Sequence, residues 1–95
     1  MKRLFWTDGA AADIEAVREF ISRDSPHYAD LVVSRILKAL QNVQHFPESG
    51  RKVPELNRPD IREVIVGRYR IVYRLKAEMV EVLTVFQGSR LLRET

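Results

Sequence analysis

An α+β domain is the fold class that this sequence of 95 residues predicts. Two helical segments with apolar stripes lie in the first half of the chain, and three extended segments follow a proline-rich loop in the second half. The expected order is β-α-α-β-β-β, with a helical hairpin packed on one face of a small antiparallel sheet. No repeat, low-complexity tract or linker interrupts the chain, so we expect residues 1–95 to form a single domain.

The first half of the chain predicts one strand and two helices. An apolar run at residues 4–6 ends at Thr7 and Asp8, which both suit the cap of a helix. The first helix is indicated by an apolar stripe at Ala10, Ile14, Val17 and Ile21. Ser25-Pro26 begins a second helix, which must end before Phe46-Pro47 and whose stripe is Ala29, Val32, Val33, Ile36, Leu40 and Val43. The tight link between the helices predicts an antiparallel hairpin.

The second half predicts a long loop and a three-stranded meander. Residues 46–60 contain three prolines and one glycine without a clear period, and we expect them to lack regular structure. Loops of this length are often functional. Extended segments at residues 61–66, 69–75 and 79–86 are joined by short connections, which favour antiparallel hairpins.

Charge is distributed unevenly along the chain. Residues 1–50 hold six Lys and Arg against seven Asp and Glu, whereas residues 51–95 hold ten against six. The basic second half suits either nucleic acid or an acidic protein segment. No apolar run is long enough to span a bilayer and no secretory signal precedes the domain, so we expect a cytoplasmic protein.

Several kinds of chemistry find no support in the sequence. There is no cysteine, and the two histidines, His27 and His45, are separated by most of the second helix, so we expect no metal site. The serines lack the context of a catalytic nucleophile, and the scattered glycines form no phosphate-binding loop. We therefore expect no cofactor.

Arginines on the strand at residues 69–75 are the strongest functional signal. Strand alternation places Arg68, Arg70 and Arg74 on the face opposite the apolar side chains. We expect Arg51, Lys52, Arg62 and Arg90 to converge with them, and few acidic residues to lie nearby. Guanidinium groups bind phosphate or carboxylate well, so an anionic partner is indicated. The alternative is an ordinary solvated face of an antiparallel sheet.

Six segments, in this order and spacing, are typical of one known family: Ala12-Asp13-Ile14, Ser25-Pro26-His27-Tyr28-Ala29, Phe46-Pro47 with Gly50-Arg51-Lys52-Val53-Pro54-Glu55, Ile61-Arg62-Glu63, Tyr69-Arg70-Ile71-Val72-Tyr73-Arg74, and Val85-Phe86-Gln87-Gly88-Ser89-Arg90. Through them the sequence resembles the RelE/ParE superfamily of bacterial type II toxins, and more closely its ParE, or plasmid-stabilisation, branch. The resemblance covers nearly the whole chain and implies a helical hairpin on a small antiparallel sheet.

The resemblance implies one of two activities. RelE-like members are ribosome-dependent mRNA endonucleases, and ParE-like members poison DNA gyrase. Arg70 and Arg90 align with catalytic arginines of the RelE pattern, but Ile61 and Glu63 replace its lysines. Its C-terminal tyrosine has no counterpart before Thr95, and Gln87 stands where many relatives have histidine.

RNA cleavage through the 2′-hydroxyl requires a proton acceptor as well as a group that stabilises phosphate charge. Arginine serves only the second role, because it stays protonated. We expect Glu63 to be an exposed partner in ion pairs rather than a base. The sequence therefore predicts a non-enzymatic toxin that inhibits DNA gyrase. The alternatives are an mRNA endonuclease using Arg70, Arg90 and Glu63, and an inactive or RNA-binding relative.

The expected partners are gyrase and a cognate antitoxin in a hetero-oligomer. We expect the antitoxin to be partly disordered, with an acidic segment for the arginine face and an amphipathic segment along Leu31, Leu37 or the sheet edge. The residues expected to bind target or antitoxin are Arg51, Lys52, Arg62, Arg68, Arg70, Arg74, Gln87 and Arg90.

Overall fold

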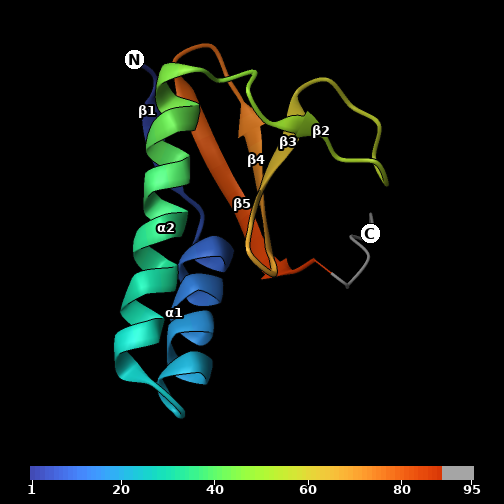
Figure 1. The fold of residues 1–95 in the computed structure, drawn as a ribbon. Coiled ribbons are helices and arrows are strands. Elements are labelled where there is room, and N and C mark those ends of the chain that lie inside the picture. Colours follow the sequence, from blue (N-terminus) through green and yellow to red (C-terminus); the bar gives the residue numbers. More distant parts are fainter. Residues whose placement is uncertain (89–95) are drawn as a thin grey trace.

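Two helices and five strands make up the part of the chain that the computed structural model describes, residues 1–88. In chain order they are β1 (Arg3–Trp6), α1 (Asp8–Ser22), α2 (Pro26–His45), β2 (Arg51–Lys52), β3 (Ile61–Val66), β4 (Tyr69–Leu75) and β5 (Met79–Gln87). The two helices lie side by side on one face of the sheet (Figure 1). This arrangement confirms the predicted α+β fold.

The sheet has the strand order β1-β5-β4-β3-β2. The meander of β3, β4 and β5 is antiparallel as predicted, but β1 pairs with β5 in parallel. A parallel pair needs a long connection, and here the rest of the domain supplies it. The expectation that residues 46–60 lack regular structure was also wrong in part, because β2 pairs Arg51 with Glu63 and Lys52 with Arg62.

Both helices begin at the predicted caps. The Thr7 hydroxyl accepts a hydrogen bond from the Ala10 N–H, and the Ser25 hydroxyl accepts one from the Tyr28 N–H. These bonds satisfy N–H groups that the first turn of a helix leaves without a partner. Pro26 occupies the first turn of α2, which ends at His45, one residue before Phe46-Pro47.

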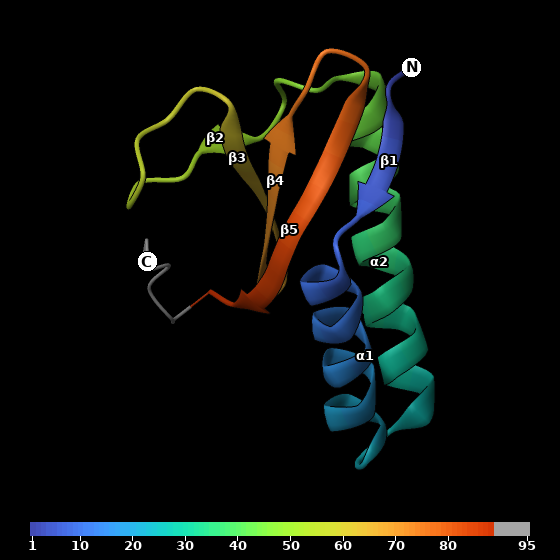
Figure 2. The ribbon, with the colours of Figure 1, turned by 180° about the vertical axis from the view of Figure 1, so that it is seen from behind.

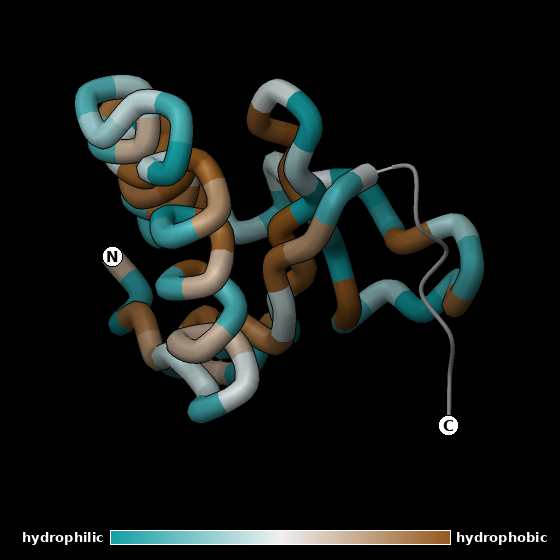
Figure 3. Tube along the Cα trace, turned by 90° about the horizontal axis from the view of Figure 1, so that it is seen from below, coloured by the Kyte–Doolittle hydropathy of each residue, from teal (hydrophilic) through white to brown (hydrophobic). Residues whose placement is uncertain are grey.

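Buried residues lie on both faces of the sheet. Hydrophobic residues recur along the helices and strands in Figure 3, interrupted by hydrophilic ones. The main core joins the helical stripes to Tyr69, Ile71 and Val82, whereas a separate cluster of Val53, Ile61 and Val72 lies on the opposite face. The long loop therefore covers part of the face that alternation alone would leave to solvent, and β4 is buried without interruption from Tyr69 to Tyr73.

Asp13 joins α1 to β5 beside a β-bulge. Val72 pairs with Thr84 and Tyr73 with Val82, so Leu83 is the additional residue. The Asp13 carboxylate on α1 accepts hydrogen bonds from the Val85 N–H at 3.0 Å and from the Thr84 hydroxyl at 2.7 Å. Asp13 thus binds groups on β5 directly beside the bulge.

Replacing Asp13 with alanine is expected to lower the free energy of unfolding by about 1.5–3 kcal/mol, since two donors lose a charged acceptor. Urea unfolding measures this as a lower midpoint at an unchanged slope. The control is Glu15→Ala on the exposed side of the same helix, which is expected to change stability by less than about 0.5 kcal/mol. Equal midpoints for the two variants would show that the Asp13 contacts contribute nothing.

Candidate functional site

Arg70 lies at the centre of a compact ion-pair cluster on the sheet face opposite the helices. Its Nε donates to Glu63 Oε1 at 2.7 Å, and its two terminal nitrogens donate to the two oxygens of Glu55 at 2.7 and 2.8 Å. Arg51 binds the second oxygen of Glu63 at 2.7 Å. We call Arg51, Glu55, Glu63 and Arg70 the Arg70 cluster. Its bidentate contact with Glu55 joins the long loop to β4.

The charged side chains at the centre of the Arg70 cluster are largely buried. The side chains of Arg70 and Glu63 are 6% and 0% exposed, and that of Glu55 is 18% exposed. The hydrogen bond with Glu55 is the largest influence on the pKa of Arg70 and, with Glu63, raises it above its ordinary value, although burial acts in the opposite direction. The Arg70 guanidinium also lies 5.1 Å from the centroid of the Phe86 ring. Arg70 therefore stays charged, and each of its nitrogens contacts a carboxylate within the protein.

Tyr73 fixes the beginning of the long loop from the other face of β4. Its hydroxyl donates to the Pro47 carbonyl at 3.1 Å and accepts from the Gly50 N–H at 3.0 Å. Burial raises the pKa of the Tyr73 hydroxyl above its ordinary value, although the bond from Gly50 lowers it. Arg62 adds a hydrogen bond to the Gly50 carbonyl at 2.9 Å. The two faces of β4 thus hold two parts of the long loop: Tyr73 binds its beginning, and Arg70 binds Glu55 further along.

The predicted convergence of the cations is found for Arg51 and Arg70, which share Glu63, but not for Arg62. Arg62 points to the same face as Tyr73, its partner in β4, and hence away from Arg70. Arg74 contacts Glu81 at 3.6 Å, whereas Arg51 shares the Glu63 carboxylate with Arg70. Arg62 is separated from Arg70 because Tyr73, its partner in β4, points to the face opposite that of Arg70.

The expectation of few acidic residues near the arginine face was wrong, because Glu55, Glu63 and Glu81 all pair with its arginines. The ion-pairing role expected of Glu63 is confirmed, but its expected exposure was wrong. Lys52 lies in the exposed strand β2. Arg90 falls outside the described residues.

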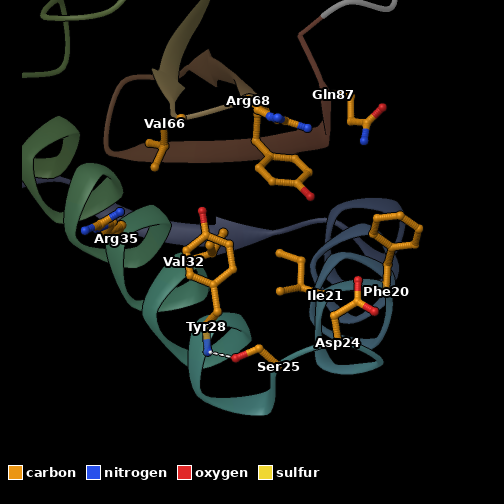
Figure 4. A pocket seen from close by; sticks show the side chains of 12 residues that line it. Phe20, Ile21, Asp24, Ser25, Tyr28, Val32, Arg35, Val66, Arg68 and Gln87 are labelled. Carbon is orange, nitrogen blue, oxygen red and sulfur yellow. Dashed lines mark hydrogen bonds between the residues drawn. The ribbon is translucent and has the colours of Figure 1, made fainter.

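Arg68 and Gln87 line a different feature, a groove of about 400 Å³ between the α1–α2 turn, at the closed end of the helical hairpin, and the β3–β4 turn. Figure 4 shows Phe20 and Tyr28 on the helical side of this groove, with Arg68 and Gln87 across from them. Phe20 and Tyr28 are 58% and 51% exposed, which is high for aromatic side chains. The groove thus combines aromatic walls with two arginines, Arg68 and Arg35, and one carboxylate, that of Asp24.

Sequence reasoning missed Glu55, Tyr73 and the two groove aromatics as parts of the sites. Glu55 was visible only as one carboxylate in a basic loop, and its partner Arg70 is 15 residues away. Tyr73 lies in the core, on the apolar face of its strand, and no local signal indicated its hydroxyl contacts. Phe20 and Tyr28 stand beside the apolar stripes of their helices, and an exposed aromatic at the edge of a stripe is the signal that was available.

Residues 1–88 contain neither a cluster of metal ligands nor a helix suited to spanning a membrane. No group of three or more histidine, aspartate or glutamate side chains in that range is arranged to hold a metal ion. Neither helix in the same range has the length and apolar character needed to cross a membrane.

Comparison with known proteins places the chain in a family. The family model described as the ParE toxin of the type II toxin-antitoxin system parDE matches residues 4–92. Toxin RelE2 of Caulobacter vibrioides is 32% identical over 92 residues, which cover 96% of this chain and 100% of that protein. Toxin ParE3 of the same organism is 28% identical over 89 residues, with coverages of 93% and 88%.

A solved structure shares the fold. The chromosomal ParDE TA system from P. aeruginosa superimposes with a TM-score of 0.74 at 23% identity, covering 92% of this chain and 96% of that one. Since the ParE family model matches almost the entire sequence, this chain belongs to the ParE toxin family of type II toxin–antitoxin systems.

Proposed function

We propose that this toxin acts by binding DNA gyrase, without catalysing a reaction of its own, and that a cognate antitoxin neutralises it. The observation that carries the proposal is the internal use of the Arg70 cluster. Arg70 is one of the two arginines that align with catalytic positions of the RelE pattern, and its side chain is 6% exposed with carboxylates on all three nitrogens. A phosphate group would have to displace Glu55 and Glu63 to reach it.

The same contacts argue against Glu63 as a general base. Its two oxygens accept hydrogen bonds from Arg70 and Arg51, and its side chain is fully buried. A base must reach the proton that it removes, and both oxygens of Glu63 are already engaged by arginines inside the fold. Gln87, which lines the groove, cannot transfer a proton at neutral pH. These features favour binding over RNA cleavage.

The groove between the helices and the β3–β4 turn is our candidate site for the antitoxin. Exposed Phe20 and Tyr28 offer apolar surface, and Arg35 and Arg68 offer charge to an acidic segment. The originally expected positions, Leu31 and Leu37, are 39% and 42% exposed on α2 and remain a second possible contact area.

Supercoiling by purified gyrase tests the proposal. Adding the toxin is expected to inhibit supercoiling or to trap cleaved DNA, and prior addition of the antitoxin is expected to prevent this. Programmed ribosomes provide the parallel assay, in which no position-specific mRNA cleavage is expected. The opposite pair of results, cleaved mRNA with unaffected gyrase, would instead establish the endonuclease alternative, for which the likeness to Toxin RelE2 is the supporting observation.

A further inference from the structure

We propose that β2 and residues 53–60, which we call the basic loop, form the surface that recognises an acidic patch on the target protein. The inference rests on the proposed function, in which that target is gyrase. Figures 1 and 2 show the basic loop projecting from the sheet on the side away from the helical hairpin. It is therefore well separated from the groove proposed for the antitoxin.

The basic loop is much longer than its connection requires. Lys52 pairs directly with Arg62, and antiparallel strands in such register can be joined by a turn of two to five residues. Here the connection instead consists of residues 53–61. Each additional residue that is ordered on folding costs conformational entropy and so lowers stability. A loop longer than its connection requires is therefore more consistent with a recognition role than with a passive link.

Anchors along its length hold the basic loop in one shape. Glu55 binds Arg70, while Val53 and Leu56 pack in the apolar cluster on the outer face of the sheet. The Val53 carbonyl accepts hydrogen bonds from the N–H groups of Leu56 and Asn57. Asn57 adopts a positive φ of 50°, which asparagine tolerates better than most residues. A loop fixed before binding loses less entropy when it meets a partner.

The outward charge of the basic loop is positive. Arg51 and Arg58 are 60% and 47% exposed, and Lys52 is exposed beside them. The Glu55 carboxylate is directed to Arg70, and Asp60 pairs with Arg58. Cations in this arrangement are complementary to carboxylates on another protein. Residues 51–60 contain no aromatic side chain on which a base could stack, which favours a protein over single-stranded nucleic acid.

Binding of immobilised toxin to purified gyrase tests the inference. The variant Lys52→Gln/Arg58→Gln removes two outward charges from the basic loop. Its matched control is Arg23→Gln/Lys38→Gln on the helical hairpin, which also removes one lysine and one arginine, and Arg23, like Arg58, contacts an exposed carboxylate. We expect the loop variant to bind gyrase about tenfold more weakly or worse and with less salt dependence, and the control to bind as the wild type does.

Other outcomes of the gyrase-binding experiment would contradict the role of the basic loop, the proposed function or both. If wild-type toxin binds gyrase and the loop variant binds equally well, the role of the basic loop is overturned and the proposed function stands. If wild-type toxin does not bind gyrase, both are overturned. Displacement of gyrase from the toxin by a short DNA oligonucleotide, lost in the loop variant, would overturn the assignment of an acidic protein surface. Equal urea midpoints for the two double variants exclude unfolding as the cause of weaker binding.

Discussion

Replacing Arg70 with methionine is expected to lower the free energy of unfolding by about 3–5 kcal/mol, since removal of one partner leaves buried charges uncompensated. The Glu63 side chain is fully buried and that of Glu55 is 18% exposed, so neither carboxylate can regain full hydration in the native fold. Methionine preserves much of the apolar volume of the arginine stem, and the loss therefore reports on charge and hydrogen bonding. Urea unfolding followed by circular dichroism measures the change.

Arg74→Met is the matched control for Arg70→Met. Arg74 lies on the same strand, but its side chain is 37% exposed and its nearest carboxylate, on Glu81, is 3.6 Å away. Such a partly exposed pair contributes about 1 kcal/mol or less. Combining Arg70→Met with Glu63→Gln and Glu55→Gln is expected to restore part of the lost stability, because the uncompensated charges are then absent. A loss no greater for Arg70→Met than for Arg74→Met would contradict the structural role assigned to the cluster.

This contrast between two arginines of one strand explains how far the sequence could predict the site. Strand alternation correctly placed Arg70 and Arg74 opposite the apolar side chains, because it depends only on neighbouring residues. It could not distinguish the buried Arg70 from the partly exposed Arg74. That difference depends on where Glu55 lies in three dimensions, and Glu55 belongs to a loop without a period.

The fold was predictable for a similar reason. Capping residues and apolar stripes are local signals, and they gave both helices, the meander and the order of elements. The parallel pairing of β1 with β5 and the bulge at Leu83 are set by contacts between distant segments. Asp13, for example, joins α1 to a strand more than 70 residues later. No periodicity within either segment indicates that contact.

Gly50 provides the second large effect, because a methyl group at this position has no space. A Cβ atom there would lie 2.2 Å from the Tyr73 hydroxyl oxygen and 2.7 Å from the Glu63 carbonyl oxygen. The second of these atoms belongs to the backbone of β3, and the first is held by Pro47 and Gly50 itself. Gly50→Ala must therefore displace the beginning of the long loop or the sheet. The expected loss is about 2–4 kcal/mol, combining steric strain with weakened hydrogen bonds.

Gly9→Ala separates this steric effect from the general effect of replacing glycine. A Cβ atom at Gly9 would lie 3.9 Å from its nearest neighbour, the Leu83 carbonyl oxygen, which is ordinary van der Waals contact. Because Gly9 lies in the first turn of α1, alanine there is expected to leave stability unchanged or to raise it by about 0.5–1 kcal/mol. Thermal unfolding of both variants measures the difference. If Gly50→Ala unfolded at the wild-type temperature, the close approach of Gly50 to Tyr73 would not be a constraint on the fold.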